Sequence, residues 1–258
     1  MSAERTRGRF SGLVRRVLCA LLGLASATLL SAAGFHASIH LLGGQAYASL
    51  QRDVIQDHNG APQVAWEELL QANQDVVAWV EVDGTSIALP VVAPRTHSVE
   101  WYMDHDLWGN WSTLGCLVLS QAPVEGSVAS KGRAVVFGHH LSGTTLMLSD
   151  LADCWQQDRF DELGTCWWCE PDGTTLRLAP VCAERTGATD ALYLEPPDEQ
   201  PAGDWLADAQ AKASAHSSEP LAPSDAAFVL SFVTCSSELA RLDGRCAVTF
   251  ACTNSAPE

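Results

Sequence analysis

The chain has 258 residues, of which 47% are hydrophobic, and it carries a formal net charge of −16 at pH 7. Its length allows one folded domain of ordinary size, and no internal repeat indicates a solenoid or an array of small units. Such an acidic surface repels nucleic acid and anionic lipid headgroups, and it favours cationic or amine-bearing partners. An acidic solvated surface without a binding role is the alternative explanation of the same charge.

The N-terminal region predicts a membrane anchor. Residues 17–35 are 19 consecutive uncharged, mostly apolar residues, which at about 1.5 Å per helical residue nearly span a hydrocarbon core of about 30 Å. The tail before them, residues 1–16, holds five arginines and one glutamate. The positive-inside rule therefore places this tail in the cytoplasm and everything after the anchor outside the cell membrane. A signal peptide cleaved near residues 31–34 is the alternative.

The first elements after the anchor are a stalk, a helix and a hairpin. Residues 36–60 are expected to form the stalk and residues 61–258 the extracellular domain. A helix is predicted over residues 62–73, because their apolar side chains recur on one helical face. Residues 76–92 are apolar on both sides of Asp83-Gly84, which is a strong hairpin signal, and they predict two strands.

The rest of the chain predicts further short strands with two helices between them. The strands are expected at residues 114–120, 133–138, 165–169, 174–182, 227–234 and 246–252, and the helices at residues 146–155 and 204–214. Clusters of Gly, Pro, Asp and Ser separate these segments. This pattern favours an all-β barrel or sandwich over a parallel α/β sheet.

Eight of the nine cysteines lie beyond the anchor, where an oxidising compartment permits disulfides. If one of the eight is a catalytic thiol, at most three bridges can form. Cys166 and Cys169 have the spacing of a redox motif or of half a zinc site, but no second ligand pair accompanies them and a Pro171-Asp172-Gly173 turn follows. The spacing therefore favours structural or locally bridged cysteines over redox or metal chemistry.

Three residues at predicted strand ends form a candidate catalytic set. His139 follows the strand at residues 133–138, Cys235 ends the strand at residues 227–234, and Arg245 begins the last strand. A thiol becomes a nucleophile when a histidine takes its proton and a cation stabilises the oxyanion. Strand alternation places Arg245 on the face opposite Cys246, outside the apolar core. Taken singly, each of these residues is more often structural than catalytic.

Several ordered blocks of the sequence resemble class B sortases, and together they cover residues 63–252. The blocks are residues 73–92 (NQDVVAWVEVDGTSIALPVV), residues 101–106 (WYMDHD) with Gly109, Ser112 and Gly115, residues 137–143 (FGHHLSG), Thr234-Cys235, and Arg245 ten residues later. Within the third block, the catalytic histidine of the family directly follows the glycine. This position favours His139, which follows Gly138, over its neighbour His140. Arg241 is a weaker rival to Arg245, because its spacing does not fit.

The resemblance implies a mainly β fold, an eight-stranded sortase-type barrel with N-terminal helices and an inserted helix before the nucleophile strand. It implies a cysteine transpeptidase that cleaves a C-terminal sorting signal of secreted proteins and passes the acyl group to an amine of the cell wall or of a pilin. Cys235, His139 and Arg245 would be the catalytic residues, and Thr234 and Ser236 would contact the substrate. No metal or other cofactor is expected.

The chain departs from the family pattern beside the nucleophile. Val233 stands where the family often has serine, and Ser236 stands where it often has an acid, which leaves the preferred sorting signal open. Other cysteine enzymes are alternatives, but papain-like enzymes place cysteine before histidine, and the Ser-x-Gly-Cys-x-Arg element of L,D-transpeptidases is not matched. A non-catalytic surface domain is the remaining alternative.

Overall fold

The computed structural model describes residues 2–55, 60–121, 126–190, 193, 200–236 and 244–253. The chain divides into two compact units, Met1–Leu42 and Gly43–Glu258. The first unit is formed by the larger part of helix α1 (Ser2–Val54), which includes the predicted anchor. Within the described part of the chain, no helix combines the length and the apolar character that crossing a membrane requires. The predicted transmembrane span is therefore not confirmed.

The second unit includes the last turns of α1, where a stalk was predicted. Tyr47 is 4% exposed and Val54 is fully buried. The Tyr47 hydroxyl donates to the carbonyl of Gly115 at 2.9 Å and accepts from the amide of Leu107 at 3.2 Å. These contacts join the helix end to the folded domain.

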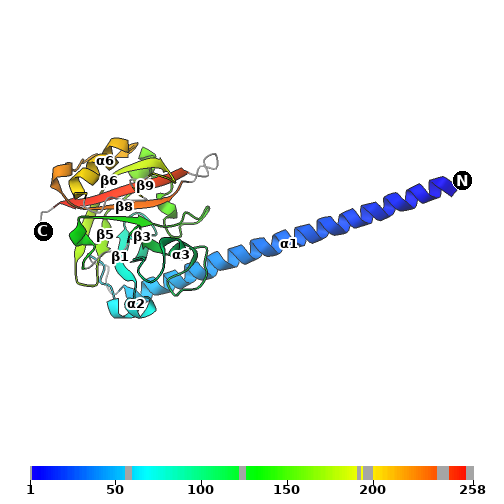
Figure 1. Ribbon diagram of the computed structural model, residues 1–258, viewed down its shortest axis with the longest axis horizontal. Helices are drawn as coiled ribbons and strands as arrows, with labels where there is room; N and C mark the ends of the chain where they lie inside the picture. Colours follow the sequence, from blue (N-terminus) through cyan, green and yellow to red (C-terminus); the bar gives the residue numbers. More distant parts are fainter. Residues whose placement is uncertain are drawn as a thin grey trace. The chain divides into compact units, whose positions relative to one another are not determined.

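Eight strands close into a barrel (Figure 1). They are β1 (Val76–Val82), β2 (Ala88–Val92), β3 (Leu117–Leu119), β4 (Arg133–Phe137), β5 (Cys166–Cys169), β6 (Thr175–Gly187), β8 (Ala226–Cys235) and β9 (Gly244–Thr253). Their order is β5-β1-β2-β3-β4-β8-β9-β6, and pairing of β5 with β6 completes the ring. The two-residue strand β7 (Ala215–His216) pairs with β6 as a side branch. The predicted eight-stranded barrel is thus confirmed, and its strand positions match the sequence-based ranges closely.

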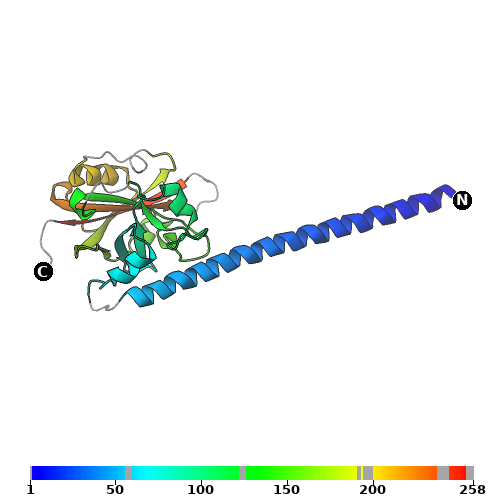
Figure 2. The ribbon, with the colours of Figure 1, turned by 60° about the horizontal axis from the view of Figure 1, so that its bottom comes forward.

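Short helices connect and cover the strands. They are α2 (Trp66–Ala72), α3 (Val99–Asp104), α4 (Gln157–Phe160) and α6 (Ala202–Lys212), with 3₁₀ turns η1 (Ala129–Lys131), η2 (Ser149–Leu151) and η3 (Pro223–Asp225). Helix α6 is the predicted inserted helix before the nucleophile strand, and it packs on β6 and β8 (Figure 2). The sequence did not predict α3 or α4.

The predicted helix at residues 146–155 is wrong, because this segment forms only the turn η2 and irregular turns. Met147 has a positive φ of 55°, a conformation that an α-helix excludes. The Ser149 and Leu151 amides donate to carbonyls three residues back, those of Leu146 and Leu148, rather than four.

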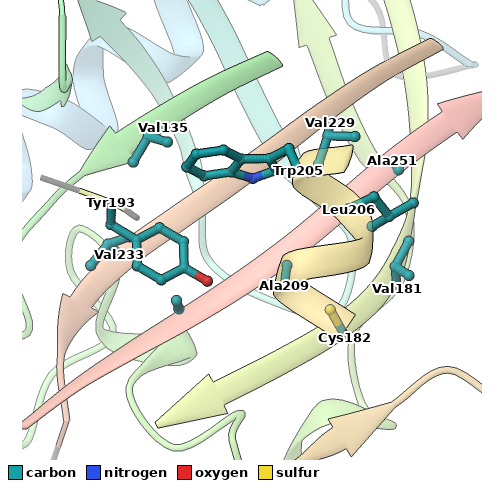
Figure 3. Close-up of a cluster of buried hydrophobic side chains, with 11 residues drawn as sticks. Val135, Val181, Cys182, Tyr193, Trp205, Leu206, Ala209, Val229, Val233 and Ala251 are labelled. Carbon is teal, nitrogen blue, oxygen red and sulfur yellow. The ribbon is translucent and has the colours of Figure 1, made fainter. Parts of the chain in front are cut away.

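Strands β8 and β9 present one face to the barrel interior and the other to α6. Phe232 and Phe250 meet inside, with ring centroids 5.9 Å apart. On the outer face, Val233 belongs to a buried cluster around Trp205 of α6 (Figure 3). Ala247 is a member of the same cluster. This arrangement confirms the predicted alternation of β9. Residues 235 and 245 continue the outer-face series by alternation.

All nine cysteines lie in the described part of the chain, and all are free. Cys166 and Cys169 are both buried in β5, three residues apart. Residues separated by an odd number on a strand point to opposite faces, so these two thiols cannot bridge each other. The local bridge among the predicted alternatives is therefore wrong, whereas structural burial of the two cysteines agrees with the structure.

Candidate active site

Strand register brings the three predicted catalytic residues to one end of the barrel. In the parallel pair β4 and β8, Phe137 lies opposite Val233, and each chain continues two residues further, to His139 and Cys235. Adjacent strands lie about 4.8 Å apart, so the histidine and the thiol leave the sheet side by side. In the antiparallel pair β8 and β9, Cys235 lies directly opposite Arg245.

The three side chains line one cleft of about 360 Å³. Apolar side chains of Val99, Met103 and Phe137 form part of its lining. A volume near 300 Å³ or more with an apolar lining and a few convergent polar groups is typical of a small-ligand or peptide site. We call this hollow the thiol cleft.

A carbonyl from α3 orients the imidazole of His139. The Nε2 atom lies 2.8 Å from the carbonyl oxygen of Met103. Because a carbonyl only accepts, Nε2 must carry the proton in this contact. The tautomer leaves Nδ1 as the nitrogen that can exchange a proton with groups in the thiol cleft.

Helix α3 is itself held firmly, which fixes the Met103 carbonyl. The amide of Cys116 donates to the carbonyl of Tyr102 at 2.8 Å. A Cβ at Gly115 would lie 2.5 Å from the Met103 oxygen, and this residue has a φ of +61°. Only glycine permits so close an approach in that conformation. The Tyr102 hydroxyl donates to the buried carboxylate of Asp75, which secures the other side of the helix.

Cys235 differs in accessibility from most of the other cysteines. Six thiols are buried, those of Cys116, Cys154, Cys166, Cys169, Cys182 and Cys246. Burial raises the pKa of Cys154 to about 12 and that of Cys169 to about 11. It also raises the pKa of Cys246, the neighbour of Arg245 in sequence. These thiols stay protonated near neutral pH, whereas half-buried Cys235 opens onto the thiol cleft.

Arg245 is half-buried at the start of β9. Its Nη1 donates to the carbonyl of Gly244 at 3.0 Å, which leaves further donors of the guanidinium available for a bound carbonyl or oxyanion. Its rival Arg241 lies outside the described residues. His140, the rival of His139, does not line the thiol cleft.

The two predicted substrate contacts behave differently. Thr234 lines the thiol cleft and is 3% exposed, and its hydroxyl has no hydrogen-bond partner among the described residues. Ser236 is not part of the lining. Its amide donates to the Gly244 carbonyl at 3.0 Å, which extends the β8–β9 pairing past Cys235.

Sequence reasoning missed one wall of the thiol cleft, formed by Thr186–Ala188 with Asp190 and Tyr193. Tyr193 donates a hydrogen bond to buried Glu184. Asp190 accepts from the Thr186 hydroxyl at 2.8 Å and from Lys212 of α6 at 3.1 Å. Desolvation raises the pKa of the Glu184 carboxyl, against the opposing effect of the tyrosine hydrogen bond. The pair of Asp190 and Lys212 joins residues 22 positions apart, and no local sequence pattern marks it.

Comparison with solved structures identifies the architecture. The chain superposes on sortase B from Bacillus anthracis with a TM-score of 0.65 and 16% identity, over 84% of this chain and 99% of that one. With sortase B from Staphylococcus aureus the TM-score is 0.59 and the identity 20%, over 74% of this chain and 78% of that one. With a Streptococcus pyogenes class B sortase involved in pilus biogenesis the TM-score is 0.58 and the identity 22%, over 73% of this chain and 97% of that one. No family model and no curated protein matches the sequence. The chain therefore has the fold of the class B sortases.

Proposed function

We propose that the chain is a cysteine transpeptidase of the sortase kind. The observation that supports this most directly is the strand register, which brings His139, Cys235 and Arg245 into one cleft. Proteins of the same fold are sortases, and this supports the same reaction class here. A fold alone does not define an activity, so the proposal depends on the site.

In the proposed reaction, Nδ1 of His139 first takes the proton of the Cys235 thiol. The thiolate attacks a peptide carbonyl carbon, and the C=O electron pair moves to oxygen. Arg245 donates hydrogen bonds to that oxyanion. As the tetrahedral intermediate collapses, the C–N bond breaks and Nδ1–H of His139 protonates the leaving amine. The product is a thioester on Cys235. A second amine then attacks the thioester, loses a proton to His139 and releases the thiolate.

The proposed donor is a C-terminal sorting signal of a secreted protein, cleaved after threonine, and the proposed acceptor is an amine of the cell wall or of a pilin. The involvement of a neighbour of the same fold in pilus biogenesis supports the second acceptor. Thr234 is proposed to contact the bound peptide, because its buried hydroxyl lacks a partner among the described residues. Ser236 is proposed to act beside it as the next residue after the nucleophile.

We also propose, from the sequence alone, that residues 17–35 anchor the enzyme in the cell membrane with the folded unit outside. Secreted substrates would meet the enzyme there. Carbonate extraction of membranes and protease accessibility of intact cells test this location. Release of the chain by carbonate at pH 11, or protection of the folded unit from external protease, would contradict it.

Trapping the acyl-enzyme tests the reaction itself. The 258-residue chain would be incubated with a panel of sorting-signal peptides and analysed by intact mass, with Cys235→Ala as the control. We expect a mass increase equal to the acyl fragment, absent in the variant and removed by an added amine. Absence of an adduct with every peptide, while Cys235 remains alkylatable, would favour a binding domain or another cysteine enzyme.

A further inference from the structure

The last turns of α1, residues 43–54, carry none of the proposed catalytic residues, yet they pack against the segments that hold His139. They begin with two consecutive glycines, Gly43 and Gly44. Glycine is unfavourable inside a helix, and at both positions it permits close packing instead. A Cβ at Gly43 would lie 3.0 Å from Cδ2 of buried Leu114. The helix therefore approaches the barrel more closely than a residue with a Cβ would readily allow.

One contact of these turns leads to the backbone of His139. A Cβ at Gly44 would lie 3.1 Å from Cδ2 of Leu146, in the loop that follows the histidine. Gly44 and Leu146 also line a hollow of about 180 Å³ between the helix and this loop. Two residues further along the loop, the amide of Leu148 donates to the carbonyl of His139 at 3.0 Å. A shift of Leu146 is therefore transmitted to the histidine within one short segment.

A second contact leads to the imidazole ring. The buried Tyr47 hydroxyl donates to the Gly115 carbonyl at 2.9 Å and accepts from the Leu107 amide at 3.2 Å. Burial raises the pKa of Tyr47, so the hydroxyl keeps its proton and remains a donor. Gly115 lies against Met103, because a Cβ at residue 115 would come within 2.5 Å of the Met103 oxygen. That oxygen accepts from Nε2 of His139 at 2.8 Å, so Tyr47 fixes the backbone on which the ring acceptor rests.

We propose that the last turns of α1 position His139, with Tyr47 and Gly44 as positioning residues. This inference rests on the transpeptidase function proposed above. Tyr47 acts on the imidazole ring through the Met103 carbonyl, and Gly44 acts on the backbone through Leu146. Neither Tyr47 nor Gly44 lines the thiol cleft, so neither touches a reacting atom. The segment that follows the predicted anchor is thus part of the framework of the active site.

A first substitution in the full chain perturbs the contact with the ring. Tyr47→Phe keeps the aromatic ring and removes the hydroxyl. Its matched control is Trp168→Phe, which removes a buried hydrogen bond of 2.7 Å to Glu170. Trp168 packs on Phe228 near the start of β8, whereas Cys235 ends that strand. The control therefore weakens the fold at the end of β8 opposite to the site.

A second substitution perturbs the contact with the backbone. Gly44→Ala adds a methyl group that Leu146 must accommodate. Its matched control is Gly34→Ala in the same helix, where a Cβ meets nothing within 4 Å. Both substitutions raise helix propensity by the same amount, so a difference between them reports the contact with Leu146.

Single-turnover acylation, followed by intact mass with a peptide that the unmodified chain accepts, gives the first measurement. We expect the maximal rate of thioester formation to fall about tenfold in Tyr47→Phe and about twofold to fivefold in Gly44→Ala, since an error near 1 Å in positioning costs up to about a hundredfold. The peptide concentration at half-maximal rate should not change, because neither residue lines the thiol cleft. Trp168→Phe and Gly34→Ala should keep the rate of the parent.

Nitrogen-15 NMR of the histidine rings gives a second measurement, which does not require turnover. The signals of His139 are assigned by their loss in His139→Gln. In the parent they should show the tautomer with the proton on Nε2, which the Met103 carbonyl requires. Tyr47→Phe should shift them toward a mixture of the two tautomers, and Trp168→Phe should leave them unchanged. A purely structural role of Tyr47 would lower the melting temperature without this change.

The outcomes separate this proposal from the proposed function. An acylation rate in Tyr47→Phe within twofold of the parent overturns the proposal, as does an equal loss in Trp168→Phe, which would indicate a general effect of stability. Equal rates in Gly44→Ala and Gly34→Ala overturn the positioning of the backbone by Gly44. Failure of acylation in the unmodified chain would instead refute the transpeptidase itself. In that case, an unchanged tautomer of His139 in Tyr47→Phe would overturn the positioning role of Tyr47, and a changed one would support it.

Discussion

Replacing Gly138 with alanine tests how His139, the proposed catalytic histidine, is positioned. A Cβ at this residue would lie 2.5 Å from Cδ2 of Leu117 and 2.8 Å from Cγ of Leu148. Both leucines are essentially fully buried, at 1% and 0% exposure. Neither can withdraw into solvent, so the new methyl group must displace packed side chains or the backbone that leads to His139.

Overpacking of this kind costs about 1–3 kcal/mol. For a domain of this size, each kcal/mol lowers the melting temperature by about 2–4 °C, so we expect Gly138→Ala to melt about 2–12 °C below the parent. Displacement of His139 relative to Cys235 should also slow thioester formation at least about tenfold, since errors near 1 Å in positioning cost as much as about a hundredfold.

Differential scanning calorimetry and the intact-mass acylation assay measure the two effects. Gly187→Ala is the matched stability control, because its Cβ meets nothing within 4 Å, and its free energy of unfolding should stay within about 0.5 kcal/mol of the parent. The double variant Gly138→Ala/Leu148→Ala should cost less than the sum of its parts, by about 1 kcal/mol. A Gly138→Ala protein that melts within 1 °C of the parent would refute the packing argument.

Three further predictions concern the thiol cleft and its surroundings. Arg245→Lys should lower the acylation rate about 10²–10³-fold at unchanged melting temperature, because a single ammonium cannot replace the guanidinium fork; a loss below threefold in single-turnover assays would contradict this role. Burial raises the pKa of Glu184 above its ordinary value of 4.5, so the folded state binds the proton more tightly and stability should fall as pH rises from about 4.5 through the raised pKa. Urea unfolding between pH 4 and 8 should show this slope in the parent, and it should flatten in Glu184→Gln. Iodoacetamide at pH 7.5 should modify Cys235 in the native protein and spare the six buried cysteines until urea is added, and peptide mapping that finds Cys182 or Cys246 labelled natively would oppose this.

Much of the barrel is predictable from the sequence because its strands carry local signals. Strands β1 and β2 pair on either side of Asp83-Gly84, the turn from which the hairpin was predicted. Strands β8 and β9 are adjacent apolar segments in the sequence, and they pair with each other in the sheet. The helix predicted at residues 146–155 is interrupted near its start by the positive φ of Met147, which composition does not reveal. Helix α3 was missed because its six residues provide too short a window for periodicity. A serine N-cap at Ser98, which accepts from the Trp101 amide, is the signal that could have located it.

The residues of the candidate site differ in how well the sequence predicts their positions. Cys235 and Arg245 face each other across one antiparallel pair whose strands are neighbours in the chain, so alternation sufficed to place them. The hydrogen bond from His139 to Met103 joins residues 36 positions apart. No pattern within either segment specifies that contact, and the tautomer of the imidazole depends on it.

The least predictable element is the parallel register of β4 against β8, and the candidate site depends on it. Because side chains alternate along a strand, a slip of one residue would move His139 to the position now held by Gly138. That position faces Leu117 and Leu148 in the interior, where an imidazole could reach neither the thiol nor the Met103 carbonyl. The packing of Leu117 and Leu148 around this position therefore has two effects. It requires glycine at residue 138 in the native register, and it makes the slipped register, which would place the imidazole there, sterically expensive.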